Sequence, residues 1–303
     1  MCKFCITAGM TTLDALRRFY ADEIRCVANL QSAALVEALA QVPREAFLGP
    51  GPWDIATPDP ARPGSVVYHK TPDADPRHVY HNVLIATDAS RELNNGHPAT
   101  LTACLDALTL RPGDRFLHVG CGVGYYTALA AAVVGTSGHV VGVELDERLA
   151  ARAAQNLRHL PHVSVLAQDA ATYAPPPRDA ILINAGFTHP LPLWLDALAP
   201  GGRLLVPVTA VAPGSPIGTG WAVLVTRDAA SRYRARTVMP MAIFASPTGR
   251  LDALDAEVRQ ALATGRWRQV SSVRRDPHER TESCCVHASG ACLSQEDPEA
   301  QRP

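Results

Sequence analysis

The amino-acid sequence predicts an α/β fold in which a mostly parallel, doubly wound sheet of seven strands carries helices on both faces. Three observations lead to this prediction. Short apolar runs typical of buried strands alternate with helical periods from Pro98 onward, turn residues separate them, and one strand leads directly into a glycine-rich loop and a helix. We expect an N-terminal helix and a C-terminal extension in addition to this core.

The composition is that of a globular protein with a sizeable core. The chain has 303 residues, 47% of them hydrophobic and 19% charged. Its net charge of −1 gives no broad basic field, which argues against nucleic acid and anionic membrane surfaces as partners. No apolar run reaches the ~18–20 residues of a membrane span, and the start lacks the apolar region of a secretory signal. We therefore expect a cytoplasmic protein whose eight cysteines are mostly thiols.

The N-terminal region, residues 1–97, is expected to contain one helix and a segment on the substrate side. Apolar residues recur at three- and four-residue steps over 12–40, with Thr12 as a cap, and Pro43 follows the end of this helix. Residues 49–80 are rich in Pro, Gly and Asp and show no period. A loop of that length in a compact domain is usually a lid or a binding segment.

The core is predicted over residues 98–240 and the extension over 241–303. Alternating strands and helices of this length indicate a parallel sheet that is covered on both faces. We expect strands at 115–119, 139–144, 163–166, 180–184 and 203–208, an antiparallel pair at 221–226 and 233–238, and helices at 98–109, 125–134, 146–159, 190–198 and 251–263. The end of the extension is a polar stretch rich in Cys and His.

The glycine loop between the first predicted strand and its helix indicates a ligand site. Gly120, Gly122 and Gly124 can adopt torsions that other residues avoid, and the helix after them directs free N–H groups into the same space. Glu144, at the end of the next strand, offers two acceptor oxygens to the hydroxyls of a ribose. This arrangement is typical of a Rossmann-like site for an adenosine-type cofactor at the carboxyl ends of the strands.

The spacing of the glycines distinguishes between cofactors. A dinucleotide fingerprint needs glycine at position 125, where this chain has Tyr125, and the third glycine comes one residue earlier. That spacing favours S-adenosyl-L-methionine over NAD. Asp169 either accepts from the adenine amino group or caps a helix, and Asn184 follows the fourth strand, where the reactive methyl group should emerge. The predicted cofactor-binding residues are His118, Gly120, Cys121, Gly122, Gly124, Tyr125, Glu144, Leu145, Asp169, Ala170 and Asn184.

Several motifs together resemble one family. They are Val-Pro-Arg-Glu-Ala-Phe at 42–47, His-Pro at 97–98, the loop with Tyr-Tyr-Thr-Ala at 120–128, and Leu-Ala-Pro-Gly-Gly-Arg-Leu at 198–204. Over roughly residues 42–210 the chain resembles the protein-L-isoaspartate O-methyltransferase family. The resemblance implies methyl transfer from S-adenosylmethionine to the free carboxylate of an isoaspartyl residue in a damaged protein or peptide.

The chain departs from the family pattern at two positions. The family has a serine where this chain has Gly96, near the acceptor, and an acid where it has His118. The predicted catalytic residues are Asn95, Gly96 and His97, and the amides of Asn94 and Asn95 either bind an acceptor carboxylate or shape a turn. If Gly96 has cost the enzyme a hydrogen bond, Gly96→Ser is expected to raise turnover of isoaspartyl peptides.

The choice of acceptor decides whether a general base is needed. A carboxylate has a pKa of about 4, so it is ionised at pH 7 and needs no base. A hydroxyl or amine would need one, and His97 and His189 are the candidates. The alternatives are therefore the same cofactor with a peptide or small-molecule acceptor of another kind, or a non-catalytic cofactor-binding protein, which the intact Glu144 disfavours.

The cysteines raise the question of a metal ion. Cys2 and Cys5 have zinc-type spacing, and Cys284, Cys285, His287 and Cys292 could supply further ligands. Both groups lie near the termini, where disorder is common, so we predict no metal ion. Cys121 is expected to be a small packing residue and not a nucleophile.

Overall fold

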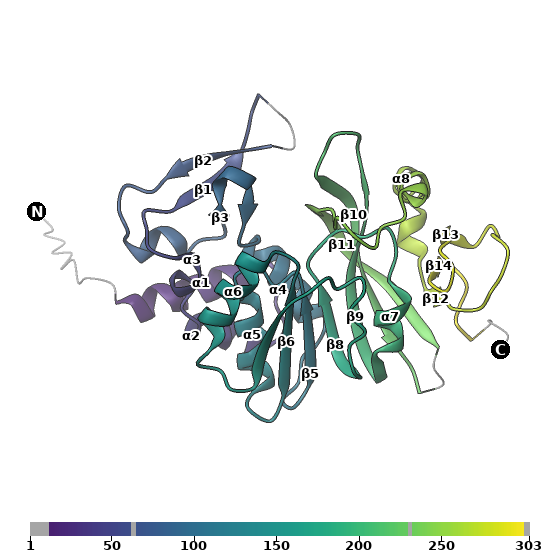
Figure 1. Cartoon of the computed structure of the whole chain (residues 1–303), viewed down its shortest axis with the longest axis horizontal. Coiled ribbons are helices and arrows are strands. Elements are labelled where there is room, and N and C mark those ends of the chain that lie inside the picture. Colours follow the sequence, from purple (N-terminus) through teal and green to yellow (C-terminus); the bar gives the residue numbers. More distant parts are fainter. Residues whose placement is uncertain (1–11, 62–64, 230–231, 300–303) are drawn as a thin grey trace, which may run out of the picture.

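The computed structural model describes residues 12–61, 65–229 and 232–299, and these form a four-stranded sheet, a ten-stranded sheet and the helices around them (Figure 1). The small sheet stands at one end of the molecule, beside the N-terminal helices. The large sheet runs from the middle to the opposite end, where the C-terminal strands lie. Among the described helices, none has the length and apolar character that crossing a membrane would require.

The N-terminal segment forms two helices, α1 (Leu13–Val27) and α2 (Ala33–Gln41), so the prediction of a single helix is wrong. Thr12 caps α1 through its hydroxyl, as expected. Between the helices Asn29 has a φ of 50°, a left-handed conformation that cannot continue a helix. The hydroxyl of Ser32 then accepts a backbone N–H and begins α2.

The segment expected to be an irregular loop, 49–80, contains two strands. After the short helix α3 (Glu45–Leu48) come β1 (Asp54–Pro58), β2 (Val66–Lys70), the 3-10 turn η1 (Pro76–Val79), β3 (Leu84–Asp88), the turn η2 (Ala89–Arg91) and β4 (Leu93–Asn94). The order is β2-β1-β3-β4, with antiparallel neighbours. The prediction failed because the strands are only half-buried and lack a clean apolar alternation.

The central region confirms the predicted alternation of strands and helices. It contains α4 (Pro98–Ala107), β5 (Arg115–Val119), α5 (Tyr125–Val134), β6 (His139–Glu144), α6 (Glu147–Leu157), β7 (Val163–Ala167), β8 (Arg178–Ile183), α7 (Pro192–Asp196), β9 (Leu198–Val211), β10 (Ile217–Arg227) and β11 (Tyr233–Phe244). The strands β9-β8-β5-β6-β7 are parallel neighbours.

The large sheet is wider and more mixed than predicted. The extension adds η3 (Asp252–Leu254), α8 (Asp255–Thr264), η4 (Arg266–Gln269), β12 (Ser272–Arg274), β13 (Cys284–Val286) and β14 (Cys292–Ser294). All pairs in the order β9-β10-β11-β12-β14-β13 are antiparallel. The expectation of seven mostly parallel strands is therefore wrong. Within the described residues the sheet has ten strands and is mixed.

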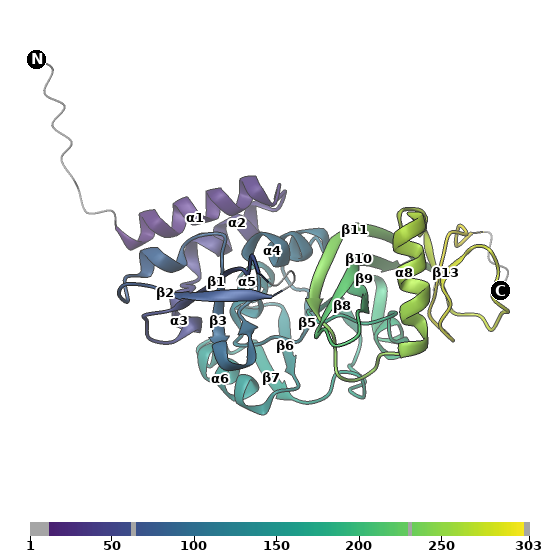
Figure 2. The same ribbon diagram turned by 90° about the horizontal axis from the view of Figure 1, so that it is seen from above.

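Helices cover both faces of the large sheet, as predicted. Alternate residues of β5 face opposite ways: Phe116 joins an apolar cluster with α1, α2, α4 and α5, whereas Leu117 and Val119 join another with α7 and α8. Figure 2 shows α1, α2, α4 and α5 gathered on one side of the strands. Residues at the carboxyl ends of β5, β6 and β8 line a cavity.

The side chain of Arg44 connects the N-terminal helices to the segment 79–83 and to Asn95 through hydrogen bonds. Its side chain is fully buried. Nη1 donates to the carbonyls of Val79 (2.6 Å) and His81 (2.8 Å), and Nη2 donates to the carbonyl of Val83 (2.8 Å) and to Asn95 Oδ1 (3.4 Å). One guanidinium therefore fixes the whole turn between η1 and β3.

We expect Arg44→Met to destabilise the protein strongly. The change leaves the carbonyls of Val79 and Val83 without a donor, while the carbonyl of His81 keeps the N–H of Val83, and each buried unsatisfied group costs about 1–3 kcal/mol. The free energy of unfolding, measured by urea denaturation, should fall by at least about 2 kcal/mol. Arg18→Met is the control, because Arg18 pairs with Glu37 at the surface and should change stability by less than about 1 kcal/mol. Equal losses in the two variants would contradict the role of Arg44.

Candidate functional site

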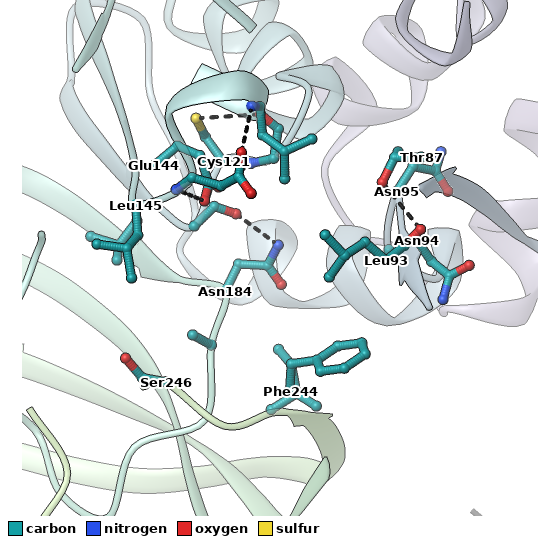
Figure 3. A pocket seen from close by; sticks show the side chains of 18 of the residues that line it. Thr87, Leu93, Asn94, Asn95, Cys121, Glu144, Leu145, Asn184, Phe244 and Ser246 are labelled. Carbon is teal, nitrogen blue, oxygen red and sulfur yellow. Dashed lines mark hydrogen bonds between the residues drawn. The ribbon is translucent and has the colours of Figure 1, made fainter. Parts of the chain in front are cut away.

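A cavity of about 700 Å³ lies where the small sheet meets the carboxyl ends of β5, β6 and β8. Figure 3 shows side chains around it from several directions: Glu144 and Cys121 on one side, Leu93 to Asn95 on another, and Phe244 and Ser246 on a third. Its lining comes from the segments 84–101, 119–126, 143–149, 168–171, 184–187 and 241–248, together with Val66 and Ile217. Every segment of the predicted cofactor site thus meets one space.

The three loop glycines all have positive φ, but they serve different purposes. A Cβ on Gly120 would lie 2.9 Å from the carbonyl oxygen of Asn184, and one on Gly124 would lie 2.8 Å from Leu157 Cδ1. A Cβ on Gly122 would meet nothing within 4 Å. Gly122 therefore presents bare backbone to the cavity. Gly124 does not line the cavity, which corrects its assignment as a contact: its role is to let α6 pack against the loop.

Glu144 lies at the end of β6, against the glycine loop. Its Oε2 accepts from the N–H of Gly122 at 2.8 Å, and its Oε1 accepts from the N–H of Asp146 at 3.1 Å. Each carboxylate oxygen has a second lone pair for a ligand hydroxyl. Beside it, Leu145 is 45% exposed at the cavity, an unusual position for a large apolar side chain and a suitable one for the face of a flat ring.

Asp169 caps a turn, one of the two roles expected for it, and one of its carboxylate oxygens still has no partner among the described residues. Oδ1 accepts from the N–H of Ala171 (2.8 Å) and from the hydroxyl of Thr248 (2.9 Å), so it caps the turn after β7. Oδ2 has no hydrogen bond to any described residue and can accept from an adenine amino group. Ala170 follows it on the cavity wall.

The remaining residues at the strand ends support the loop. Asn184 Nδ2 donates to the carbonyl of Gly120 at 3.1 Å. Tyr125 lines the cavity and is almost fully buried. Cys121 is also buried and lies against Gly142, and burial raises the pKa of the Cys121 thiol well above its usual range. These contacts agree with Cys121 being a packing residue and not a nucleophile.

His118 does not reach the cavity, so its assignment to the cofactor site is wrong. The alternation along β5 directs Val119 to the cavity and turns the ring of His118 into the core. There the side chain is fully buried, and its Nδ1 lies 2.9 Å from the hydroxyl of Thr127 on α5. Burial lowers the pKa of His118 to about 3, so the ring is neutral.

Asn95 is the predicted acceptor-side residue with an unused hydrogen-bonding group. Its side chain lines the cavity and is 8% exposed. Oδ1 accepts from the N–H of Ile85 and from Arg44, both at 3.4 Å. Nδ2 is buried and finds no partner among the described residues. A buried amide donor without a partner is costly, so Asn95 Nδ2 is a candidate donor to a ligand oxygen.

Gly96 is held in a conformation that suits glycine. Its φ is +87°, and a Cβ there would lie 2.4 Å from Leu101 Cδ1 and 3.1 Å from Tyr126 Cε2. The carbonyl of Gly96 accepts from the hydroxyl of Tyr126 at 2.9 Å. A serine cannot enter this position without moving its neighbours, which argues against the expectation that it would restore a missing contact.

The two histidines considered as bases differ in position. His97 precedes α4 and lines the cavity, and burial together with the positive charge of Arg44 lowers its pKa. His189 is almost fully buried beside Thr188 and lies outside the cavity lining, with its pKa lowered to about 4 by burial. The structure therefore removes His189 from the candidates for a general base.

One wall of the cavity was not predicted. β11 was expected to end at 238 but continues to Phe244, which brings Met241–Phe244 and then Ser246 and Thr248 to the cavity. A second unpredicted feature is an ion pair of 2.6 Å between Arg91 and Asp146, which both line the cavity and join its small-sheet side to the loop after β6. Neither depends on a local sequence pattern.

Comparison with known proteins shows the family to which this chain belongs. The model of the protein-L-isoaspartate(D-aspartate) O-methyltransferase (PCMT) family matches residues 72–214. Protein-L-isoaspartate O-methyltransferase 1 of Rhodopseudomonas palustris is 34% identical over 208 residues, which are 65% of this chain and 73% of that protein.

Two solved structures share the fold. One, a protein-L-isoaspartate O-methyltransferase, has a TM-score of 0.60 at 20% identity and covers 87% of this chain and 72% of its own. The other, a protein-L-isoaspartate O-methyltransferase from Plasmodium falciparum in complex with S-adenosyl-L-homocysteine, has a TM-score of 0.56 at 15% identity and covers 77% of this chain and 98% of its own.

The cavity of this chain fits the cofactor of the family. Gly122 offers bare backbone, Glu144 has lone pairs for ribose hydroxyls, and Leu145 provides an exposed apolar surface beside them. The chain belongs to the protein-L-isoaspartate(D-aspartate) O-methyltransferase family, and it is an S-adenosylmethionine-dependent methyltransferase.

Proposed function

We propose that the enzyme transfers a methyl group to a carboxylate of a protein or peptide, and that this carboxylate is of the isoaspartyl type. One observation supports this most directly. A single cavity joins the open backbone of Gly122, with Glu144 beside it, to the unpartnered amide of Asn95. A carboxylate oxygen is a strong acceptor for such an amide donor. The names of the relatives support the same class of acceptor.

The residues of the chain supply binding and orientation. S-adenosylmethionine, when bound, supplies a methyl group that its positive sulfur already activates. Gly120, Gly122, Glu144, Leu145 and Asp169 hold it, with Ala170, Asn184, Cys121 and Tyr125 completing this side of the cavity. Asn95 then orients the acceptor carboxylate. Positioning of this kind, with water kept out, is the main contribution that an already activated methyl donor requires.

No general base is needed for this acceptor. An isoaspartyl carboxylate is ionised at neutral pH and carries its own lone pair. His97, the cavity histidine with a lowered pKa, is then a neutral neighbour of the acceptor that can donate or accept a hydrogen bond. The small-sheet segment 84–97 is the substrate side of the site. It belongs to the N-terminal domain of residues 1–97 and faces the cofactor core of residues 98–240, which the extension of residues 241–303 follows.

A second candidate keeps the cofactor and changes the acceptor. The observation that favours it is the conformation of Gly96, because the serine hydroxyl that the family pattern provides cannot be present here. A peptide carboxylate with another backbone around it would not need that contact. The two candidates predict different results with a matched pair of peptides.

A labelled-methyl assay with an isoaspartyl peptide and its ordinary aspartyl twin tests the proposal. We expect methyl transfer to the isoaspartyl peptide and none to its twin. Asn95→Ala should lower kcat/KM by about 10–100-fold, because a lost hydrogen bond to a charged group is worth about 1.5–3 kcal/mol. Binding of S-adenosylhomocysteine should be unchanged in this variant.

The matched control for that assay is Asn94→Ala. The Asn94 amide is already satisfied by Tyr68 and by the carbonyl of Glu92, so its loss should affect kcat/KM less. Equal labelling of the two peptides, or labelling of neither while another carboxylate peptide is methylated, would favour the second candidate. An unchanged kcat/KM in Asn95→Ala would remove this residue from the acceptor site.

We expect Glu144→Gln to weaken binding of S-adenosylhomocysteine by about 1.5–3 kcal/mol, since the hydrogen bonds to the ribose lose their charged partner. Glutamine keeps one oxygen that can accept from Gly122, so the loop should stay folded. Calorimetric titration measures the affinity, and circular dichroism checks the fold. Glu147→Gln, on the first turn of α6, is the control. Normal affinity in Glu144→Gln would show that this acid does not hold the cofactor.

We expect Gly96→Ser to lower activity and not to raise it. The side chain would meet Leu101 and Tyr126 at a φ of +87°, and a forced left-handed conformation costs about 1–2 kcal/mol even without a clash. Turnover of the isoaspartyl peptide and the thermal midpoint should both decrease. A rise in turnover with unchanged stability would mean that the segment can move aside and that the hydroxyl serves the acceptor after all.

A further inference from the structure

Four potential metal ligands meet in the C-terminal extension. His278, Cys284, His287 and Cys292 each offer one ligand atom, and these atoms all lie within 4.8 Å of one another. Cys284 begins β13, Cys292 begins β14, and His287 lies in the turn between these paired strands, while His278 comes from the loop that precedes them. Both thiols are fully buried. The cluster therefore brings together side chains from the β13–β14 hairpin and from the loop that precedes it.

The histidine contacts leave ring nitrogens for a metal ion. His278 Nδ1 lies 2.8 Å from the carbonyl oxygen of Asp276, an acceptor, so Nδ1 carries the proton and Nε2 has the lone pair. That Nε2 lies 3.7 Å from Cys284 Sγ. His287 Nδ1 is buried and makes no hydrogen bond to any residue that the structure describes. His287 thus has a ring nitrogen without a partner, and the contact printed for His278 Nε2 is with another member of the cluster.

The contacts of the cysteines distinguish Cys284, which belongs to the cluster, from its neighbour Cys285. Cys284 Sγ accepts from the backbone N–H of Thr281 at 3.3 Å, a contact that favours the thiolate form that binds metals. Cys285, the next residue, points away: its Sγ lies 3.6 Å from the carbonyl of Arg266 and its side chain belongs to an apolar cluster. The strand alternation therefore selects Cys284 and excludes Cys285.

We propose that His278, Cys284, His287 and Cys292 bind a structural zinc ion. Two thiolates and two imidazoles form a standard tetrahedral zinc set, and four protein ligands leave no open position for catalysis. Around zinc such ligand atoms lie about 3.3–3.8 Å apart, so the cluster needs to contract by about 1.5 Å at most. The prediction from sequence of no metal ion is replaced by this proposal.

The place of the cluster indicates what the ion does. β12 joins the large sheet through two registered pairs with β11, and the chain between β12 and β13, residues 275–283, has no helix or strand. A zinc ion would tie this loop to the hairpin and so hold β12–β14 on the edge of the sheet. β11 also carries Met241–Phe244 to the cavity, but no described residue after Thr248 lines it. The ion is therefore expected to stabilise the extension and not to take part in methyl transfer.

Metal analysis of the full chain tests the proposal. Protein expressed with zinc in the medium and purified by gel filtration should contain one zinc ion per chain by elemental mass spectrometry. The Cys284→Ser, Cys292→Ser double variant should lose it. Cys285→Ser is the matched control and should keep it, because its side chain faces the apolar cluster. The Cys2→Ser, Cys5→Ser variant should also keep it, which separates this site from the cysteine pair at the N-terminus, outside the described residues.

Cobalt gives a readout that does not depend on how the double variant folds. Metal-free wild-type chain titrated with Co²⁺ should develop the intense visible bands of tetrahedral cobalt and a thiolate charge-transfer band in the near ultraviolet, and zinc should displace both. Chelation should increase proteolysis within 275–283. Wild-type protein without bound zinc and without these bands, retention of zinc in the double variant, loss in the Cys2→Ser, Cys5→Ser variant, or a Cys284–Cys292 disulfide in the purified protein would overturn the proposal.

Discussion

The small-sheet side of the cavity depends on the buried guanidinium of Arg44. A buried positive charge is costly unless its donors are satisfied. Among the described residues both Nη atoms of Arg44 find acceptors, none of them a carboxylate, and Nε finds none. Three backbone carbonyls and Asn95 Oδ1 take its hydrogen bonds instead. Because Arg44 and Ile85 occupy the oxygen of Asn95, its amide nitrogen is the atom left without a partner among the described residues. The same charge favours the neutral form of His97.

The parallel region of the fold could be predicted from sequence because local signals there agree with one another. β5, α5 and β6 begin and end at the predicted residues, since each is bounded by glycines or by a polar turn. The strands of the extension could not be predicted. Each has three residues, one of them centred on Cys285, and an alternation of that length is indistinguishable from a polar loop. They are strands because β11 offers an edge to pair with.

The candidate site also has residues that local sequence signals predict and residues whose place depends on long-range packing. It could be predicted that Gly122, Glu144 and Asp169 lie around one space, because the carboxyl ends of parallel strands meet at one edge of a sheet. His118 was wrongly included because the strand alternation that turns it into the core competes with its closeness in sequence to the loop. The wall formed by Met241–Phe244 arises from pairing between distant strands, and the fit around Gly96 depends on Leu101 and Tyr126. Such long-range packing leaves no mark in the local sequence.

The ion pair between Arg91 and Asp146 has a consequence for the kinetics of the enzyme. It joins two sides of the cavity next to Glu144, and the Arg91 side chain is 48% exposed. Salt screens charges in such a setting over about 10 Å at 0.1 M. A bound ligand that leaves past this point must widen the cavity rim, which separates the two charges. Because salt weakens the attraction between them, the rate at which the ligand dissociates should rise with ionic strength. The methyl-transfer step, which takes place inside the cavity, should respond to salt far less.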